Sequence, residues 1–290
     1  MSSSNLITAQ ALQARLAQNP ANVLVCDCRF DLVDPDLGQR AYEASHLPGA
    51  VYVDLGRSLS GEKNGRNGRH PLPDADVFAK FLATLGVNHD TLIVCVDAQG
   101  GLYGSRLWWL ARWVGHANVV VLDGGMAAWE KAGYALTAAQ PAARPFGNFK
   151  RSASLALSVE LAGMQAGLGR ADRLIVDARA GDRFQGQNET LDPVAGHIPG
   201  AASRPVKENL NDDGTFKAPE VLRAELTKLL GSHPAKDLVA SCGSGVSACH
   251  LLLALELAGM PGGALYGGSW SEWSSQPNAP IETGPSRVTG

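Results

Sequence analysis

The 290-residue sequence has little net charge, few cysteines and no long hydrophobic run. Its 25 lysines and arginines face 28 aspartates and glutamates, so the net charge of −3 leaves no positive excess for a phosphate backbone, and we expect no nucleic-acid partner. No apolar run approaches the roughly 20 residues that span a bilayer, because the run at 251–257 is interrupted by Glu256. We therefore expect no membrane partner.

Targeting and metal-binding signals are also missing. Residues 1–18 show no basic stretch leading into an apolar one, so we expect neither a signal nor a transit peptide and predict a cytoplasmic protein. Five cysteines are an odd number, which favours reduced thiols over a disulfide framework. Cys26 and Cys28 have no second pair at ligand spacing, so no metal or other cofactor is expected.

The chain resembles itself at a spacing of about 150 residues. Asp27 corresponds to Asp177, and residues 46–50 (HLPGA) correspond to residues 197–201 (HIPGA). Two later blocks keep the same order, namely 92–97 with 238–242 and 123–125 with 266–268. We predict domains at residues 1–140 and 155–290, joined by a proline-containing linker at 141–154.

Each copy alternates short apolar runs with longer segments of helical periodicity. Strands are expected at 23–26, 92–96, 119–122, 174–176 and 238–241. Helices are expected at 77–85, 105–114, 219–230 and 248–258. This alternation predicts an α/β protein of two domains, each a mainly parallel sheet flanked by helices.

The segment at 241–248 (SCGSGVSA) lies where an apolar strand stops and a long helix starts. Gly243 and Gly245 permit a tight loop whose amides converge on one point, and the helix adds the positive end of its dipole. A thiolate at Cys242 is stabilised in such a place, so its pKa should lie below the usual value of about 8.5. Cys242 is therefore the candidate nucleophile. The other four cysteines are interpreted as buried small hydrophobes.

Two other interpretations of this loop lack a required residue. Residues 243–248 fit a dinucleotide fingerprint, but the region about 20 positions later offers no acid for the ribose. A thiol phosphatase loop needs an arginine six positions after its cysteine, where this chain has Ala248. Dinucleotide binding and phosphoryl transfer are both disfavoured.

Histidines and arginines near the predicted strand ends are the other candidates. His197 and His46 occupy equivalent turns, which favours a structural role for His197, whereas His46 could serve the site, with Asp36 or Glu43 orienting it. Arg179 has a twin in the first copy and is expected to pair with the strand-end acid. Arg183 has no twin, so we predict that its guanidinium holds a substrate carboxylate.

These motifs together resemble the tandem rhodanese-like sulfurtransferases over roughly residues 5–275. The matching features are the duplicated Asp-x-Arg and His-[Leu/Ile]-Pro-Gly-Ala blocks, an inactive first copy with Asp97 at the nucleophile position, and the Cys242 loop. That loop is similar to the version found in the 3-mercaptopyruvate branch, with Ser247 where that branch usually has threonine. The thiosulfate branch usually places basic residues after the cysteine.

The resemblance implies a chemistry and a set of site residues. Cys242 would take a sulfane sulfur as a persulfide and pass it to cyanide, a thiol or thioredoxin. Ser244, His46 and an acid near Asp36 would form the proton relay, and Arg183 would be one of two substrate arginines. The remaining substrate-binding positions are those of the loop, Gly243, Gly245, Val246 and Ser247. The second arginine is missing, because no basic residue lies between Arg183 and His197.

The uncharged loop also favours one donor. Thiosulfate is a dianion, and a loop of amides and a hydroxyl attracts it less than a loop with two cations. We therefore expect 3-mercaptopyruvate as the small-molecule donor, with thiosulfate:cyanide transfer as the alternative. A non-catalytic sulfur carrier and a dinucleotide-binding protein are the remoter alternatives.

Overall fold

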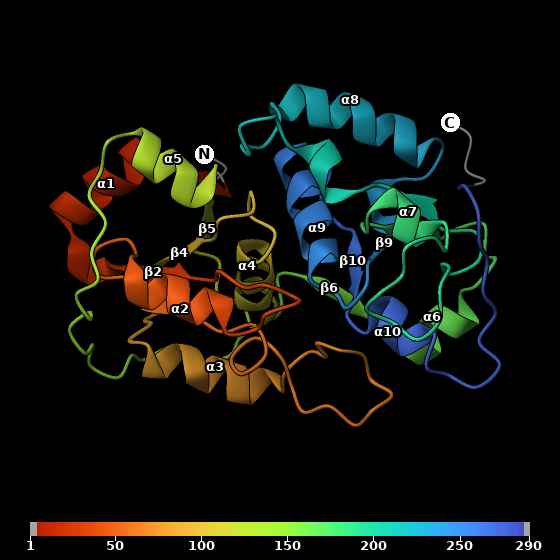
Figure 1. Ribbon diagram of the computed structural model, residues 1–290, viewed down its shortest axis with the longest axis horizontal. Helices are drawn as coiled ribbons and strands as arrows, with labels where there is room; N and C mark the ends of the chain where they lie inside the picture. The colour runs from red at the N-terminus through yellow and green to blue at the C-terminus, as the bar shows by residue number, and fades with distance from the viewer. Residues whose placement is uncertain (1–4, 287–290) are drawn as a thin grey trace. The chain divides into compact units, whose positions relative to one another are not determined.

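The computed structural model describes residues 5–286, which form two compact units (Figure 1). Unit 1 comprises the chain up to Gly61, Pro73–Leu155 and Asp212–Phe216. Unit 2 comprises Glu62–Leu72, Ala156–Asn211 and the chain from Lys217 onward. The predicted linker, residues 141–154, forms neither helix nor strand and belongs to unit 1. A short segment of each half is thus part of the other unit.

Each unit is built on a five-stranded sheet whose strands pair in parallel. In spatial order the unit 1 sheet contains β1 (Leu6–Ile7), β5 (Val119–Leu122), β4 (Leu92–Val96), β2 (Val23–Asp27) and β3 (Val51–Tyr52). The unit 2 sheet contains β6 (Leu157–Val159), β10 (Ala264–Tyr266), β9 (Leu238–Ser241), β7 (Leu174–Asp177) and β8 (Ala202–Ser203). The two orders are the same when the copies are aligned, which confirms the predicted fold class.

Helices cover both faces of each sheet, as parallel strands buried on both sides require. Unit 1 has α1 (Ala9–Gln18), α2 (Leu37–Ala44), α3 (Ala75–Thr84), α4 (Gly104–Trp113) and α5 (Gly125–Lys131). Unit 2 has α6 (Leu161–Ala166), α7 (Gly181–Phe184), α8 (Pro219–Leu230), α9 (Ser247–Leu257) and α10 (Ser269–Trp273). Short 3-10 turns lie at Pro20–Asn22, Val206–Asn209 and Ala235–Asp237. All four predicted helices are present within two residues of their predicted bounds.

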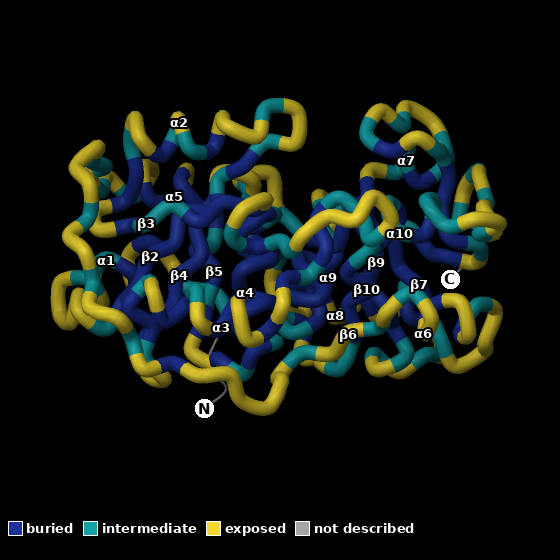
Figure 2. Tube along the Cα trace, turned by 90° about the horizontal axis from the view of Figure 1, so that it is seen from below, coloured by how far each residue is buried: buried dark blue, intermediate teal, exposed yellow. Residues whose placement is uncertain are grey.

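The core of each unit lies between its sheet and these helices. In unit 1, Tyr42 of α2 and Trp129 of α5 pack on one sheet face with Val25 and Val94. In unit 2, Phe184, Trp270 and Trp273 pack on one face, while α9 contacts β9 and β10 on the other and α8 contacts α9. Figure 2 shows the strands and helices α4 and α9 mainly as buried chain. No helix within residues 5–286 has both the length and the apolar character needed to cross a membrane.

Candidate active site

The Cys242 loop joins β9 to α9 at the carboxyl edge of the unit 2 sheet. The Gly245 amide, two residues before the first residue of the 11-residue helix α9, donates a hydrogen bond to Cys242 Sγ at 3.1 Å. Gly245 has φ +75°, and a Cβ there would come within 2.2 Å of the Gly267 carbonyl oxygen. Only glycine can therefore supply this amide. Cys242 itself is 1% exposed.

The turn between β10 and α10 holds the loop from its other side. Ser269, whose φ is +53°, accepts a hydrogen bond from the Cys242 amide at 3.0 Å, and its Oγ lies 4.0 Å from Cys242 Sγ. The amides of Trp270 and Ser271 donate to the carbonyls of Cys242 and Gly243, both at 2.9 Å. These contacts hold the nucleophile in one orientation before a donor arrives.

A buried guanidinium stands next to the sulfur. Arg179 donates to both oxygens of Asp177 and to the Gly196 carbonyl, and it lies over the Trp270 ring at 5.1 Å. Burial opposes its charge, but the carboxylates of Asp177 and Glu189 and the Cys242 thiolate outweigh that effect and raise the Arg179 pKa. The predicted pairing of Arg179 with the strand-end acid is confirmed. Its cation also favours a thiolate at Cys242.

Arg183 lies on α7 beside the same loop. Its Nε and one terminal nitrogen donate to both Glu189 oxygens, with the shortest contact at 2.8 Å. Burial raises the pKa of Glu189, but hydrogen bonds from Arg183 and from the Leu191 amide outweigh this and lower it. An Arg183 terminal nitrogen lies 3.6 Å from the position that a Cβ on Gly243 would take. The predicted substrate arginine and the Cys242 loop are therefore neighbours.

A second arginine reaches the loop from residues 62–72, which we call the strap. Arg69 forms an ion pair with Asp192, and a terminal nitrogen of Arg69 lies 2.8 Å from the Cβ position of Gly243. Arg69 was not predicted, because the second cation was expected between Arg183 and His197. The basic, glycine-rich run at 65–70 (GRNGRH) was the available signal.

The next strap residue supplies the histidine. His70 Nδ1 lies 2.9 Å from Ser244 Oγ, and both residues are buried. Ser244 lies two positions after Cys242 on the same loop. This pair holds a titratable ring against the hydroxyl of a residue on the Cys242 loop, which is the kind of pair that a proton relay needs.

Hydrogen bonds at two points hold the strap to the rest of unit 2. The Arg69 amide donates to Ser271 Oγ at 3.0 Å, and the Arg66 carbonyl accepts hydrogen bonds from Ser275 and Gln276. Gly68 has φ +89°, and a Cβ there would approach the Gly268 carbonyl oxygen within 2.8 Å. Close backbone contact thus sets where Arg69 and His70 lie.

The structure assigns His46 a different role from the predicted one. Its Nδ1 lies 2.7 Å from the Tyr42 carbonyl oxygen, its Nε2 lies 3.2 Å from that of Ala139, and its ring stacks on Tyr42. His197 repeats this arrangement on Phe184. Backbone carbonyls therefore lie next to both ring nitrogens of His46, and the histidine in contact with Ser244 is His70 instead.

Asp36 is corrected together with His46. It is exposed at the N-terminal end of α2, where its carbonyl accepts from the Arg40 amide, while the His46 ring contacts Tyr42 and the Ala139 carbonyl. Asp36 was predicted from the family resemblance and from its nearness to His46 in the sequence. Nearness along the chain does not place an exposed helix-cap side chain against a buried ring.

The last two predicted loop positions begin helix α9. Val246 is buried at the N-cap and Ser247 is the first helical residue. Together with Gly243 and Gly245 they form the turn in which the Gly245 amide donates to Cys242 Sγ. Their assignment to donor binding stays a prediction.

The other cysteines are buried, as predicted. Burial raises the pKa of Cys26 to about 12 and also raises the pKa of Cys28 and Cys95 well above the usual value. Cys249 is fully buried on α9, with its Sγ 3.2 Å from the Gly245 carbonyl oxygen. Cys26, Cys28 and Cys95 therefore stay protonated near neutral pH, and burial shields Cys249 from reagents in solution.

The equivalent loop of unit 1 carries a carboxylate instead of a thiol. Asp97 accepts hydrogen bonds at 2.8–2.9 Å from the amides of Gln99, Gly101, Tyr103 and Gly104. The converging amides of this copy are thus occupied by the chain's own anion. No nucleophile stands at this position.

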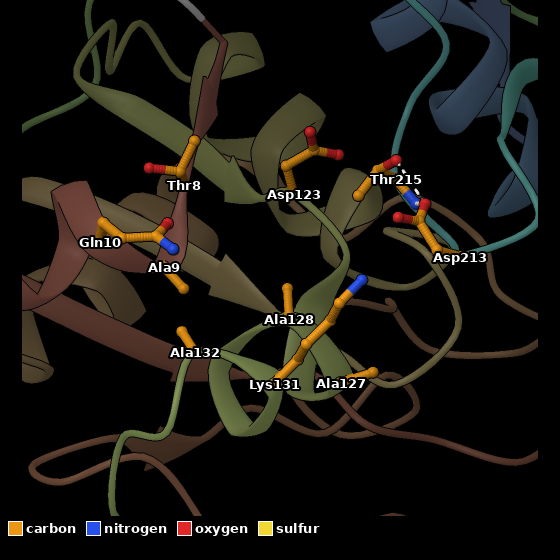
Figure 3. Close-up of a pocket in the computed structure, with 10 residues that line it drawn as sticks. All are labelled: Thr8, Ala9, Gln10, Asp123, Ala127, Ala128, Lys131, Ala132, Asp213 and Thr215. Carbon is orange, nitrogen blue, oxygen red and sulfur yellow. Dashed lines mark hydrogen bonds between the residues drawn. The ribbon is translucent and has the colours of Figure 1, made fainter.

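Unit 1 also holds a pocket of about 390 Å³ beside the ends of β1 and β5 (Figure 3). Lys131 extends along it, and Asp123 and Asp213 line it. Burial raises the pKa of Asp123, although the Phe216 amide donates to its carboxylate. No cysteine lines this pocket.

Comparison with known proteins gives consistent matches. Residues 8–132 and 160–276 each match the family described as "Rhodanese-like domain". A Pseudomonas aeruginosa protein named "Probable 3-mercaptopyruvate sulfurtransferase" is 47% identical over 98% of this chain and 100% of its own length. A "Thiosulfate sulfurtransferase" of Cricetulus griseus is 36% identical over 84% of this chain and 82% of its own length. The solved "3-mercaptopyruvate sulfurtransferase from Leishmania major" superposes with a TM-score of 0.82 at 27% identity, covering 94% of this chain and 75% of that one.

Proposed function

Because this chain belongs to the rhodanese-like family of sulfurtransferases, we propose that it takes sulfur from 3-mercaptopyruvate onto Cys242 and passes it to a thiophilic acceptor. The observation that carries the proposal is the environment of one sulfur atom. Cys242 Sγ accepts the Gly245 amide at a helix N-terminus, beside a serine hydroxyl held by His70. Each feature favours an anionic nucleophile with a proton relay next to it.

The first half-reaction is a displacement at sulfur. The Cys242 thiolate attacks the donor sulfur, so an S–S bond forms and the donor's C–S bond breaks. The electron pair of that bond leaves on the carbon as the enolate of pyruvate. The Ser244–His70 pair supports the donor carbonyl and supplies the proton that converts the enolate to pyruvate. Cys242 is left as a persulfide.

The second half-reaction returns the thiol. A nucleophilic acceptor attacks the outer sulfur of the persulfide, the S–S bond breaks, and Cys242 leaves as a thiolate. Cyanide then becomes thiocyanate, and a thiol becomes a persulfide. Small thiols and thioredoxin are the proposed acceptors besides cyanide.

The donor carboxylate has two cations available. Arg183 and Arg69 each have a terminal nitrogen close to the position that a Cβ on Gly243 would take, and Gly243 is the residue after Cys242. A guanidinium pair can hold a carboxylate through charge-assisted hydrogen bonds. In this proposal, Arg69 of the strap serves as the second substrate arginine, because no basic residue lies between Arg183 and His197.

A mass measurement tests the proposal. Wild-type protein treated with 3-mercaptopyruvate should gain the mass of one sulfur on the peptide that contains Cys242, and cyanide should remove it as thiocyanate. Cys242→Ser should gain none, because a hydroxyl is not a competent nucleophile near neutral pH. Cys249→Ser is the matched control, seven residues away and buried, and should behave as wild type.

Two results would contradict parts of this proposal. Retained transfer in Cys242→Ser with loss in Cys249→Ser would move the reaction to the other thiol. A higher kcat/KM for thiosulfate than for 3-mercaptopyruvate would support the second candidate, thiosulfate transfer. That candidate is favoured by the two guanidiniums at the loop and by the thiosulfate sulfurtransferase relative.

A further inference from the structure

Asp192 is the acid that stands between the two arginines of the site. Its Oδ1 forms the ion pair with Arg69, and its Oδ2 lies 3.6 Å from a terminal nitrogen of Arg183. Its amide donates to Glu189 at 3.1 Å, which fixes the turn that carries it. The Asp192 side chain is only 2% exposed. A buried negative charge therefore adjoins both cations that the proposed function assigns to the donor.

One oxygen of this carboxylate is unusually placed. Asp192 Oδ2 is buried and accepts no hydrogen bond from any residue in the described range 5–286. A buried carboxylate oxygen without a hydrogen bond is costly, so stability alone does not favour an aspartate over an asparagine here. The second observation is its direction, since the same oxygen is the one that faces Arg183.

The charges around the loop balance. The cations are Arg69, Arg179 and Arg183, and the acids paired with them are Asp177, Glu189 and Asp192. Asp177 and Glu189 are bonded to Arg179 and Arg183 through short contacts, so they serve to orient those guanidiniums. Asp192 makes no hydrogen bond to Arg183. Its negative charge therefore also acts on an anionic donor group bound by the two arginines.

We propose that Asp192 selects the sulfur donor by its charge. This inference rests on the proposed function, whose site it deepens. With Asp192 ionised, the two arginines attract a donor that carries one negative charge. The same carboxylate repels each further negative charge on the donor, so thiosulfate, a dianion, is disfavoured more than a monocarboxylate. Asp192 is thus a specificity-determining residue, and it touches no reacting atom.

The test separates binding from turnover. In a Cys242→Ser background no sulfur is transferred, so sulfate and pyruvate serve as non-reacting probes with two charges and one charge. Asp192→Asn keeps the shape and removes the charge. The ratio of sulfate affinity to pyruvate affinity, measured by calorimetry, should rise about tenfold or more, because the removed repulsion acts twice on the dianion. With Cys242 restored, kcat/KM for thiosulfate relative to 3-mercaptopyruvate should rise by a similar factor.

Asp172→Asn is the matched control. It makes the same change of charge in the same unit, but its carboxylate pairs with the exposed Arg170. This variant should leave both ratios at the wild-type value. If Asp192→Asn also leaves them there, the selection by charge is overturned.

Failure to fold does not leave the inference untested. Asp192→Ser is the second variant, and the ratios are expressed per folded protein. If neither variant folds, the Cys242→Ser protein decides, because selection by charge requires pyruvate to bind it more tightly than sulfate. Absence of any sulfur uptake from 3-mercaptopyruvate would instead sink the proposed function. Normal uptake with unchanged affinity ratios sinks only the role of Asp192.

Discussion

Arg183 and Arg69 differ in how their guanidiniums are held. Arg183 is fixed by a carboxylate on the same turn of chain, through hydrogen bonds of 2.8–3.3 Å to Glu189. Arg69 is carried by the strap and meets Asp192, which is 123 residues away in the sequence. At the residue scale, one cation is therefore positioned locally and the other only by tertiary contacts.

Removing either guanidinium should impair donor recognition. A charge-assisted hydrogen bond contributes about 1.5–3 kcal/mol, so Arg183→Ala and Arg69→Ala should each lower kcat/KM for 3-mercaptopyruvate by roughly ten- to a hundredfold. The lysine variants should recover only part of the loss, because an ammonium cannot reproduce the planar fork. Steady-state kinetics with 3-mercaptopyruvate and cyanide measure both effects.

Arg170→Ala is the control for this pair, since Arg170 pairs with Asp172 on the surface of the same unit. It should leave kcat/KM unchanged. A lower melting temperature with intact kcat/KM in Arg183→Ala or Arg69→Ala would assign that arginine to the fold and not to the donor.

At the scale of elements, the strap is hydrogen-bonded to helix α10. Ser271 accepts the Arg69 amide at 3.0 Å, and its own amide donates to the Gly243 carbonyl at 2.9 Å. One residue therefore ties the strap to the catalytic loop. Its position sets the distance between the His70–Ser244 pair and Cys242.

Ser271→Ala should loosen this tie without unfolding the unit. A neutral hydrogen bond contributes about 0.5–1.5 kcal/mol, so we expect kcat/KM to fall roughly three- to tenfold with little change in melting temperature. Ser271→Thr keeps the hydroxyl acceptor and should restore most of the activity. Kinetics and thermal unfolding of the two variants provide the measurement.

Ser274→Ala tests whether any serine change on this turn has the same effect. The Ser274 hydroxyl is buried and has no hydrogen-bond partner in the described part of the chain. Its loss should not change kcat/KM. A Ser271→Ala protein with full activity and reduced stability would show that the strap is held by other contacts.

At the scale of the whole molecule, the two units have sheets of the same topology. The corresponding loops carry different residues, Cys242 in unit 2 and Asp97 in unit 1. The Cys242 loop of unit 2 offers an amide to a sulfur, whereas four amides in unit 1 bind the Asp97 carboxylate. Unit 1 also buries His116, whose ring packs edge-on against Phe149. The stability of the chain therefore also depends on buried groups of the unit that lacks the Cys242 loop.

Protonation of His116 should make folding sensitive to acid. Its Nε2 lies 2.9 Å from the Thr91 carbonyl oxygen, its Nδ1 is buried without a partner among the described residues, and burial lowers its pKa. The unfolded chain binds a proton near the usual pKa of about 6.5, while the folded chain does not, so stability falls as pH drops below that value. Each unit of pKa lowering corresponds to about 1.4 kcal/mol.

Urea unfolding at pH 8 and pH 5.5 measures this dependence. Wild type should lose more stability between the two than His116→Gln, which replaces the ring by a neutral amide. His89→Gln is the control, because His89 is exposed beside the same Phe149 ring. Equal losses in wild type and His116→Gln would assign the acid sensitivity to other groups.

The sequence alone predicted the fold class, the family and the placement of Cys242. These depend on patterns that are local or repeated: apolar runs of 4–5 residues such as 92–96, helical periodicity, and equal blocks about 150 residues apart. Cys242 needed only its two neighbouring elements, because a strand end followed by glycines and a helix creates the anion-stabilising turn within one segment. Arg183 was found by its lack of a twin.

The tertiary structure decided which histidine and which second arginine belong to the site. His70 and Ser244 are 174 positions apart, and the strap that carries His70 is part of the opposite unit from its neighbours in sequence. His46 was predicted from the family resemblance, but it lies in the repeated turn, where backbone carbonyls contact both of its ring nitrogens. Patterns along a chain record the periodicity of elements, whereas the meeting of two side chains depends on packing between segments, which no local pattern encodes.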